Sequence, residues 1–402
     1  MSSCFPTPAL PAEYDHIAMQ AHCRRVGAAA VELAERLQFS TDKQKALSEA
    51  AAVHHRFATA PDSRFLNRLI LDVWGFQQDG GLEDKSAASM EMAQLLELCC
   101  LFVQRWEYSP YELAGFTEIV DELRGMAHDG FFEKKHVDGL AVVPSVDRRQ
   151  VDRIVSSLPV FPAVALTAMQ LAVNPDASAV QLEKLIGTDP VLAGEVLRTA
   201  NSPLFSPVTP IRTIRQAVMF MGLPEACRVL SAASLRPIFQ SPLLRPLWTH
   251  SLEVARFTEA LARASGKADP EEAFLTGLIH DVGRLALWKL PANVSARYRQ
   301  LLDQGCEPLF AEVLLCGFDH AAAGADVARH WRLPPAISEA IENHHQPERT
   351  NSPLACLLYL SEHWSGANED LPSLARLHIA LGQTSLTKTD LDRVKAKPTL
   401  EW

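Results

Sequence analysis

The chain has 402 residues, which is too long for one comfortable helical core and favours two domains. Hydrophobic residues make up 48% of the chain and charged residues 21%, which is typical of a folded globular protein and excludes extensive disorder and collagen-like repeats. The 38 basic and 48 acidic residues give a net charge of −10, and a chain of this charge repels a phosphate backbone. We therefore expect no nucleic-acid partner.

Targeting and redox features favour the cytoplasm. The opening segment MSSCFPTPALPAEYDH has no basic region followed by an apolar run, and no later stretch reaches the roughly 18 consecutive apolar residues that would span a bilayer. The 8 cysteines show no CxxC spacing and mostly lie in apolar helical runs, as buried reduced thiols do. We expect a cytoplasmic protein with no membrane partner.

Helical periodicity dominates the chain, and runs with the period of a strand are almost absent. In the stretch from His22 to Leu37, apolar positions recur with a helical period and place the histidine on the buried face. Ser40 and Thr41 offer a cap for a second helix that runs towards His54. The pattern predicts an all-α fold.

A later stretch repeats this arrangement. A predicted helix that begins at His250 is followed by a loop and by AFLTGLIHD, which ends with His280 and Asp281. The paired histidines are 32 residues apart in the first stretch, between His22 and His54, and 30 apart in the second. We interpret the two stretches as copies of one helix-loop-helix unit, and hence predict two tandem helical domains.

Proline and glycine mark the boundaries between these regions. GLAVVPSVDRRQ, residues 139–150, is the candidate linker between the halves. Proline-containing turns flank a predicted helix from Ala163 to Val173. Further helices are expected around residues 371–396, in a tail that carries no readable motif.

The His280-Asp281 pair is the strongest candidate for chemistry. On a helix the two side chains lie about 100° apart, so both can converge on an ion held beside the helix. A carboxylate among imidazoles suits a divalent transition metal such as Mn, Fe, Zn or Ni, with positions left for water and phosphate. The structural alternative is a set of buried side chains that hydrogen-bond to one another and hold no metal.

Side chains on later predicted helices extend this group. His320 opens one helix, His344 and His345 close the helix from Pro335, and Glu362 lies on a further run, where a carboxylate can bridge two ions. The candidate metal ligands are His250, His280, Asp281, His320, His344 and Glu362.

The second half resembles HDOD (HD-related output) domains over roughly residues 150–365. The resemblance rests on SSLPVFPAVALTAMQLAVNPDASAVQLEKLIGTDPVLAGEVLRTANSPLF, on AFLTGLIHDVGRL and on GFDHAAAGADVARHWRLPPAISEAIENHH. Residues 10–140 are similar to a degenerate HD-GYP domain, because AAAVHH places His55 where that family has aspartate, and Cys100 or a neighbour replaces its metal-binding aspartate. We expect a non-catalytic sensory or dimerising module there, a helical tail over 366–402, and metal binding in the second half alone.

The resemblance implies bacterial signal transduction, with the HDOD domain as an output or scaffold module linked to cyclic-di-GMP signalling. It also implies that the histidines and Asp281 stand where active HD relatives bind metal. Arg284 stands where HD-GYP enzymes place a lysine, and Glu362 replaces their aspartate with one more methylene. These two substitutions weigh against turnover, in which Asp281 and Arg284 would be the candidate catalytic residues.

Three functions remain open at this point. In the leading interpretation a cytoplasmic regulator presents apolar helix faces to a signalling protein, and its first half tunes that contact or forms a homodimer. The faces considered bear Leu182, Leu185, Met219 and Met221, and the alternative, which the pattern favours, is that these residues belong to the core. The alternative is a metal-dependent phosphohydrolase of nucleotides or cyclic dinucleotides, with Arg284 steadying phosphate. In the third, the same pocket binds a nucleotide without cleaving it. A basic cluster outside this centre, Arg212, Arg215 and Arg228, is interpreted as solvated surface.

Overall fold

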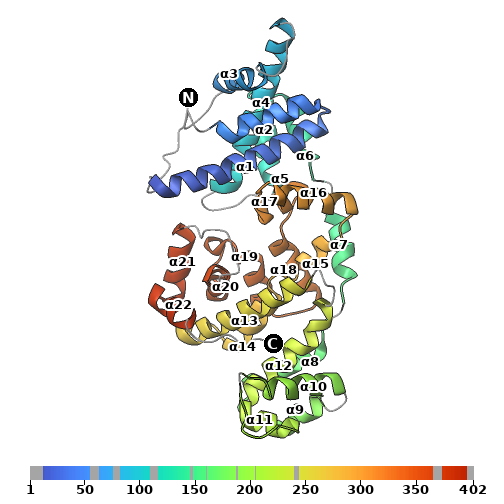
Figure 1. Cartoon of the computed structure of the whole chain (residues 1–402), viewed down its shortest axis with the longest axis vertical. Coiled ribbons are helices and arrows are strands. Elements are labelled where there is room, and N and C mark those ends of the chain that lie inside the picture. Colours follow the sequence, from blue (N-terminus) through green and yellow to red (C-terminus); the bar gives the residue numbers. More distant parts are fainter. Residues whose placement is uncertain are drawn as a thin grey trace. The chain divides into compact units, whose positions relative to one another are not determined.

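The computed structural model describes residues 12–54, 63–75, 82–108, 116–144, 148–159, 161–186, 189–203, 205–239, 244–364 and 374–395. Every regular element in these ranges is a helix, which confirms the all-α class (Figure 1). His55 lies outside the described residues. All seven described cysteines are buried free thiols, as predicted.

The chain folds into two compact units. The first comprises Met1–Gln150 together with Leu290–Asp319, and the second comprises Val151–Lys289 together with His320–Trp402. The segment 290–319, which the sequence pattern assigns to the second domain, therefore packs with the first unit. The reason is apolar burial: Phe310 is 0% exposed, and its ring centroid lies 5.1 Å from that of Trp106.

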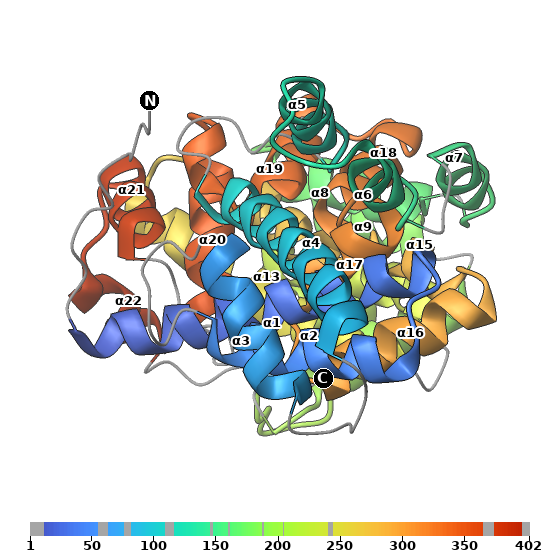
Figure 2. The ribbon, with the colours of Figure 1, turned by 90° about the horizontal axis from the view of Figure 1, so that it is seen from above.

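The helices of the first unit are α1 (Ala12–Arg36), α2 (Thr41–Val53), α3 (Ser63–Gly75), α4 (Leu82–Tyr108), α5 (Phe116–His128), α6 (Lys134–Ala141), α16 (Ala292–Asp303) and α17 (Pro308–Cys316). Helices α1 to α4 lie side by side (Figure 1, Figure 2). The predicted stripe on α1 is buried at His22, Val26 and Leu33. Helix α2 begins after Ser40 as predicted, although that side chain makes no capping hydrogen bond.

The helical break predicted over residues 139–150 is shorter at both ends in the structure. Helix α6 continues to Ala141, and α7 (Arg148–Ser156) begins inside the predicted stretch. Gly139 does not break α6 but lets it pack closely, because a Cβ there would lie 2.9 Å from Cδ1 of Leu33 on α1.

Among the described residues, the break after α6 covers residues 142–144, and the chain is helical again from Arg148. Helical packing decides this outcome, because Val137 and Leu140 are both 0% exposed and hold the end of α6 in the core of the first unit.

The helices of the second unit are α8 (Ala163–Val173), α9 (Ala179–Ile186), α10 (Pro190–Ala200), α11 (Ile214–Met221), α12 (Leu223–Leu235), α13 (Arg245–Ser265), α14 (Pro270–Ile279), α15 (Arg284–Trp288), α18 (His320–His330), α19 (Pro335–Asn343), α20 (Pro353–Trp364), α21 (Leu374–Thr384) and α22 (Lys388–Lys395). Helix α8 has the predicted bounds. The loop between α13 and α14 also follows the prediction: Gly266 ends α13 at a φ of 64°, and Asp269 caps α14 through the backbone N–H groups of Glu271 and Glu272.

Two apolar cores lie within the second unit. Helices α8 to α12 share one of them, which includes Leu182, so the core alternative is confirmed for Leu182. Met219 on α11 is 80% exposed and fits the surface alternative. The other core joins α13, α19 and α20 to the tail helices α21 and α22 through Leu357, Ala380 and Leu391.

Helix α4 is the one helix among the described residues with the length and apolar character of a membrane span. Its mean hydropathy is 1.2 over Ala87–Glu107, and 56% of that window is buried inside the protein. Helices α11 and α12 reach the same threshold only when taken together, and they are bent by 120°. Packing in a helical core accounts for the composition of α4.

Candidate metal centre

The His280-Asp281 pair lies in a tight turn of the second unit. His280 ends α14 as its C-cap residue and Asp281 follows in the turn before α15, so the expectation that both lie within one helix is corrected. Two glycines, one at the end of α14 and one in the turn, allow close packing against neighbouring helices. A Cβ on Gly277 would lie 2.6 Å from Cα of Ala255 on α13, and one on Gly283 would lie 1.9 Å from the carbonyl oxygen of His320. Because these two residues have no side chain, the end of α14 packs directly against α13 and the turn packs directly against α18.

Four of the predicted ligands form one group. His250 from α13, His280, Asp281 and Glu362 from α20 each offer a ligand atom within 4.8 Å of the others. Oε1 of Glu362 lies 2.5 Å from Nε2 of His280 and 3.1 Å from Nε2 of His250. The extra methylene of the glutamate lets its carboxylate reach both imidazoles.

A second group adjoins the first. It contains His320, His344 and His345, whose ligand atoms also lie within 4.8 Å of one another. Oδ1 of Asp281 lies 3.1 Å from Nε2 of His320, so this carboxylate connects the two groups. The structure thus brings together all six predicted ligands. His345 was missing from that set, although the adjoining His344-His345 pair was the signal that could have included it.

Backbone carbonyls orient two of these imidazoles. Nδ1 of His280 donates to the carbonyl oxygen of Gly277 at 2.7 Å, and Nδ1 of His344 donates to that of Ile341 at 2.6 Å. A hydrogen bond of this kind fixes the tautomer and leaves the Nε2 lone pair to bind an ion. Burial lowers the pKa of His344 to about 3, so its ring is neutral.

This donor set fits a divalent transition metal. Nε2 of His344 is buried and has no hydrogen-bond partner within the described residues, which is costly unless an ion or another group occupies the position. Imidazole nitrogens with Asp281 and Glu362 oxygens match Mn, Fe, Zn or Ni. A metal held there would polarise a phosphoryl oxygen or lower the pKa of a bound water.

Charge and burial limit access to the centre. Asp281 is 1% exposed; burial alone would raise its pKa, but Arg284 and then the imidazoles hold it well below the usual range. The pKa of Glu362 is likewise low because its imidazole neighbours outweigh the effect of burial. Nε of Arg284 lies 2.9 Å from Oδ2 of Asp281, where the guanidinium competes with a cation for that oxygen. The predicted phosphate-binding arginine is therefore already paired.

A third group of candidate ligands lies in the first unit. His22 on α1, His54 at the end of α2 and Cys100 on α4 are all buried, and their ligand atoms lie within 4.8 Å of one another. All three residues stand out in the sequence, although we expected metal binding in the second half alone. Burial raises the pKa of the Cys100 thiol to about 12, which argues against a nucleophilic thiolate in the metal-free protein.

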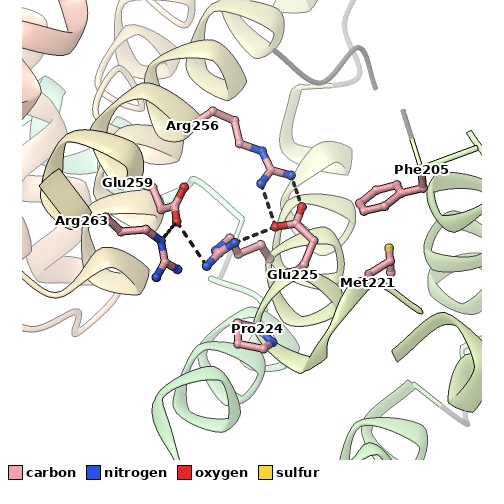
Figure 3. A pocket seen from close by; sticks show the side chains of 8 residues that line it. Phe205, Met221, Pro224, Glu225, Arg256, Glu259 and Arg263 are labelled. Carbon is pink, nitrogen blue, oxygen red and sulfur yellow. Dashed lines mark hydrogen bonds and ion pairs between the residues drawn. The ribbon is translucent and has the colours of Figure 1, made fainter. Parts of the chain in front are cut away.

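A surface pocket of about 580 Å³ lies elsewhere in the second unit (Figure 3). It is lined by Phe205, Met221, Pro224, Glu225, Arg228, Arg256, Glu259 and Arg263. None of the candidate metal ligands lines it.

Ion pairs neutralise the arginines of this pocket. Glu225 accepts from Nη2 of Arg256 at 2.5 Å and from Nη1 of Arg228 at 2.6 Å, and Glu271 accepts from Nη2 of Arg228 at 2.5 Å. Arg228 is 7% exposed, so its interpretation as solvated surface is wrong. The lining contains three arginines and two glutamates, and Glu271 beside it supplies a third carboxylate, so little uncompensated positive charge is left to attract phosphate.

Comparison with known proteins locates a family domain in the second part of the chain. The model of the HDOD domain matches residues 158–347. Among solved structures, an HDOD domain protein of unknown function from Geobacter sulfurreducens is 24% identical, with 62% of this chain and 92% of that chain covered and a TM-score of 0.54. A candidate signal transduction protein from Marinobacter aquaeolei VT8 is 20% identical, with 63% and 65% covered and a TM-score of 0.53. These likenesses show the fold.

Similar sequences include proteins with other names. An uncharacterised protein of Treponema pallidum is 25% identical over 198 residues, which are 48% of this chain and 38% of that protein. Ribonuclease Y of Geobacter sulfurreducens is 26% identical over 224 residues, which are 54% of this chain and 36% of the enzyme. The matches therefore span little more than a third of the length of these relatives.

Proposed function

Residues 158–347 form an HDOD domain, and from this premise we propose that the chain is a bacterial signal-transduction regulator that acts through protein–protein contacts rather than through turnover. The observation that carries the proposal is the burial of most of the histidine centre, in which only His250 and His345 among the candidate ligands are partly exposed. His280, Asp281 and His344 are at most 1% exposed. A hydrolytic metal site needs an open position for water and substrate, whereas a closed one serves to hold helices together.

Exposed apolar side chains support the contact role. Val191 on α10 is 70% exposed, and Met219 and Phe220 on α11 are 80% and 47% exposed. Apolar side chains of this size cost free energy in water, and partner proteins commonly cover them. The partner we propose is a signalling protein, in a pathway linked to cyclic di-GMP.

The first unit supports a regulatory role by its likeness to the second. In both, a histidine on a long helix faces a histidine at the C-terminal end of the next helix. The ring centroids are 5.6 Å apart for His22 and His54 and 5.1 Å apart for His250 and His280. We interpret the first unit as a degenerate HD-type copy that senses a signal or forms a homodimer.

The second candidate function is a metal-dependent phosphohydrolase of nucleotides or cyclic dinucleotides. The specific observation in its favour is the neutral, buried Nε2 of His344, which is ready to bind an ion. A relative named Ribonuclease Y adds to this reading. Closure of the centre and the pairing of Arg284 with Asp281 weigh against it.

One assay separates the two functions. Anaerobic, reduced protein loaded with Mn²⁺ or Fe²⁺ is incubated with bis-p-nitrophenyl phosphate and with cyclic di-GMP, beside an Asp281→Ala variant. We expect no metal-dependent hydrolysis by either protein. Hydrolysis that Asp281→Ala abolishes would overturn the scaffold proposal. Calorimetry with cyclic di-GMP on the same samples tests the nucleotide-binding alternative, in which heat of binding appears without hydrolysis.

A further inference from the structure

The first unit places two imidazoles and one thiol around a common point. Nε2 of His22 lies 3.6 Å from Sγ of Cys100, and Cys23 also approaches, with its Sγ 3.7 Å from Nδ1 of His54. A tetrahedral zinc ion with Zn–N of about 2.0–2.1 Å and Zn–S of about 2.3 Å separates its nitrogen and sulfur ligands by roughly 3.6 Å. The one nitrogen–sulfur distance within the group, 3.6 Å between His22 and Cys100, matches that separation, and the ligand atoms of His22, His54 and Cys100 all lie within 4.8 Å of one another.

Hydrogen bonds orient both imidazoles as metal ligands. Nδ1 of His22 donates to Oε2 of Glu107 at 2.6 Å, which is the carboxylate–histidine pairing found behind metal-binding imidazoles. Nδ1 of His54 donates to the carbonyl oxygen of Ala51 at 2.6 Å. In each ring the other nitrogen, Nε2, is thereby assigned as the one that accepts an ion.

Glu107 is itself held in place by a partly buried arginine. Nη1 of Arg25 donates to Oε1 of Glu107 at 2.5 Å, and Nε of Arg25 donates to Oε2 of Glu307 at 2.8 Å. Both carboxylate oxygens of Glu107 are thus engaged, one by His22 and one by Arg25. A fixed outer carboxylate of this kind is typical of a site built to hold a ligand in one geometry.

We propose that His22, His54 and Cys100 form a zinc site that clamps α1, α2 and α4 of the first unit. Two imidazoles with a thiolate select a borderline or soft ion and disfavour Mn²⁺ and Mg²⁺, which prefer oxygen ligands. On binding, a Zn–S bond forms and the thiol proton leaves to solvent, so no electron is transferred. Three protein ligands leave the fourth tetrahedral position to water or to an exchangeable ligand.

Cobalt substitution tests the site in the full-length protein. Metal-free, reduced protein is titrated with Co²⁺, and absorption in the near ultraviolet is recorded, because a thiolate bound to Co²⁺ gives a charge-transfer band there. None of the candidate ligands in the second unit is a cysteine, so the band reports the first unit alone. We expect the band in the wild-type protein and its loss when Zn²⁺ is added in excess of the candidate centres of both units.

Two variants of α4 provide the matched comparison. Cys100→Ala should abolish the band and weaken zinc binding at the first unit by at least about 100-fold. Cys99→Ala is the control, because Cys99 is the preceding residue, is equally buried and lies outside the group. Far-ultraviolet circular dichroism checks that both variants fold. A wild-type protein without the band would overturn the proposal, as would a band of equal strength in Cys100→Ala; the first outcome is decisive even if that variant misfolds.

Discussion

The two units carry histidine centres on similar helical frames but with different third ligands. In the second unit α13, α14 and α20 bring His250 and His280 to Glu362. In the first unit α1, α2 and α4 bring His22 and His54 to Cys100. In both units the helices position two imidazoles. The residue on the third helix supplies a carboxylate oxygen in the second unit and a thiol sulfur in the first. Asp281 adds a further carboxylate to the second group, so the two ligand sets differ at more than one residue.

The centres also differ in how their first histidine is held. His22 donates to Glu107, a side chain outside the ligand group, whereas His250 lies directly against Glu362, which belongs to the group. Burial alone would lower the pKa of His250, but the Glu362 carboxylate raises it. The first unit thus separates the orienting carboxylate from the ligands, and the second unit does not.

The largest effect is expected for Asp281→Ala. This carboxylate touches both histidine groups of the second unit, so its loss should reduce Mn²⁺ or Fe²⁺ affinity by at least about 100-fold. Equilibrium dialysis with metal analysis measures the change. The cobalt–thiolate band of the first unit should persist in the same variant. If the Asp281→Ala protein retained bound Mn²⁺, the second unit would not depend on this carboxylate for metal binding, and the contrast drawn between the two centres would be wrong.

A smaller effect is expected for Glu107→Gln. The amide keeps the shape of the side chain but loses the negative charge that orients His22, so zinc affinity of the first unit should fall about 10–100-fold. Competition with a chromophoric chelator measures this affinity. Binding of Mn²⁺ to the second unit serves as the internal control. Equal loss at both centres would indicate general unfolding and would remove the assigned role of Glu107.

Each unit also contains an arginine that lies between carboxylates, and its contribution to stability can be measured. Arg228 in the second unit lies among Glu225, Glu259 and Glu271, as Arg25 in the first unit lies between carboxylates. Glu225→Gln should lower the free energy of unfolding by about 2 kcal/mol at neutral pH, because it removes charged hydrogen bonds from a buried pair. Urea denaturation of metal-free protein measures the difference.

This difference should depend on pH with a defined sign. Burial alone would raise the pKa of Glu225, but Arg256 and Arg228 lower it below the ordinary value of 4.5. The stabilisation by the ionised carboxylate is therefore complete above pH 4.5 and is lost as the pH falls through the folded-state pKa. The free energies of unfolding of the wild-type and Glu225→Gln proteins should therefore converge as the pH falls. A difference that grows in acid would contradict the pairing of Glu225 with the two arginines.

The smallest effect on stability is expected at the exposed face of α11. Met219→Ser should change the free energy of unfolding by less than about 0.5 kcal/mol, because the side chain is 80% exposed. In the proposed function the same change weakens partner binding. Cross-linking in cells compares recovery of a partner by wild-type, Met219→Ser and Asp281→Ala proteins. Undiminished recovery by Met219→Ser would exclude this face as the contact.

Much of the second unit could be predicted from local patterns. The bounds of α8, the glycine end of α13 and the histidines that open α18 and follow α19 all depend on caps and periodicity, which act within a few residues. The presence of two successive histidine-bearing helices in each half was predicted from the same periodicity. The start of the predicted break at residue 139 was wrong, because Gly139 packs against Leu33 and the two residues are far apart in the chain.

The sequence by itself predicted the helical class and six candidate ligands in the second unit, because these follow from local periodicity and from residue types at fixed spacing. The HDOD assignment rested on a resemblance between sequence segments, and the family model matches residues 158–347. Only the tertiary structure decided that Arg284 is paired with Asp281, that His345 joins the centre, and that Cys100 meets His22 and His54. Such contacts depend on helices that are distant in sequence, and their geometry arises from close packing of side chains.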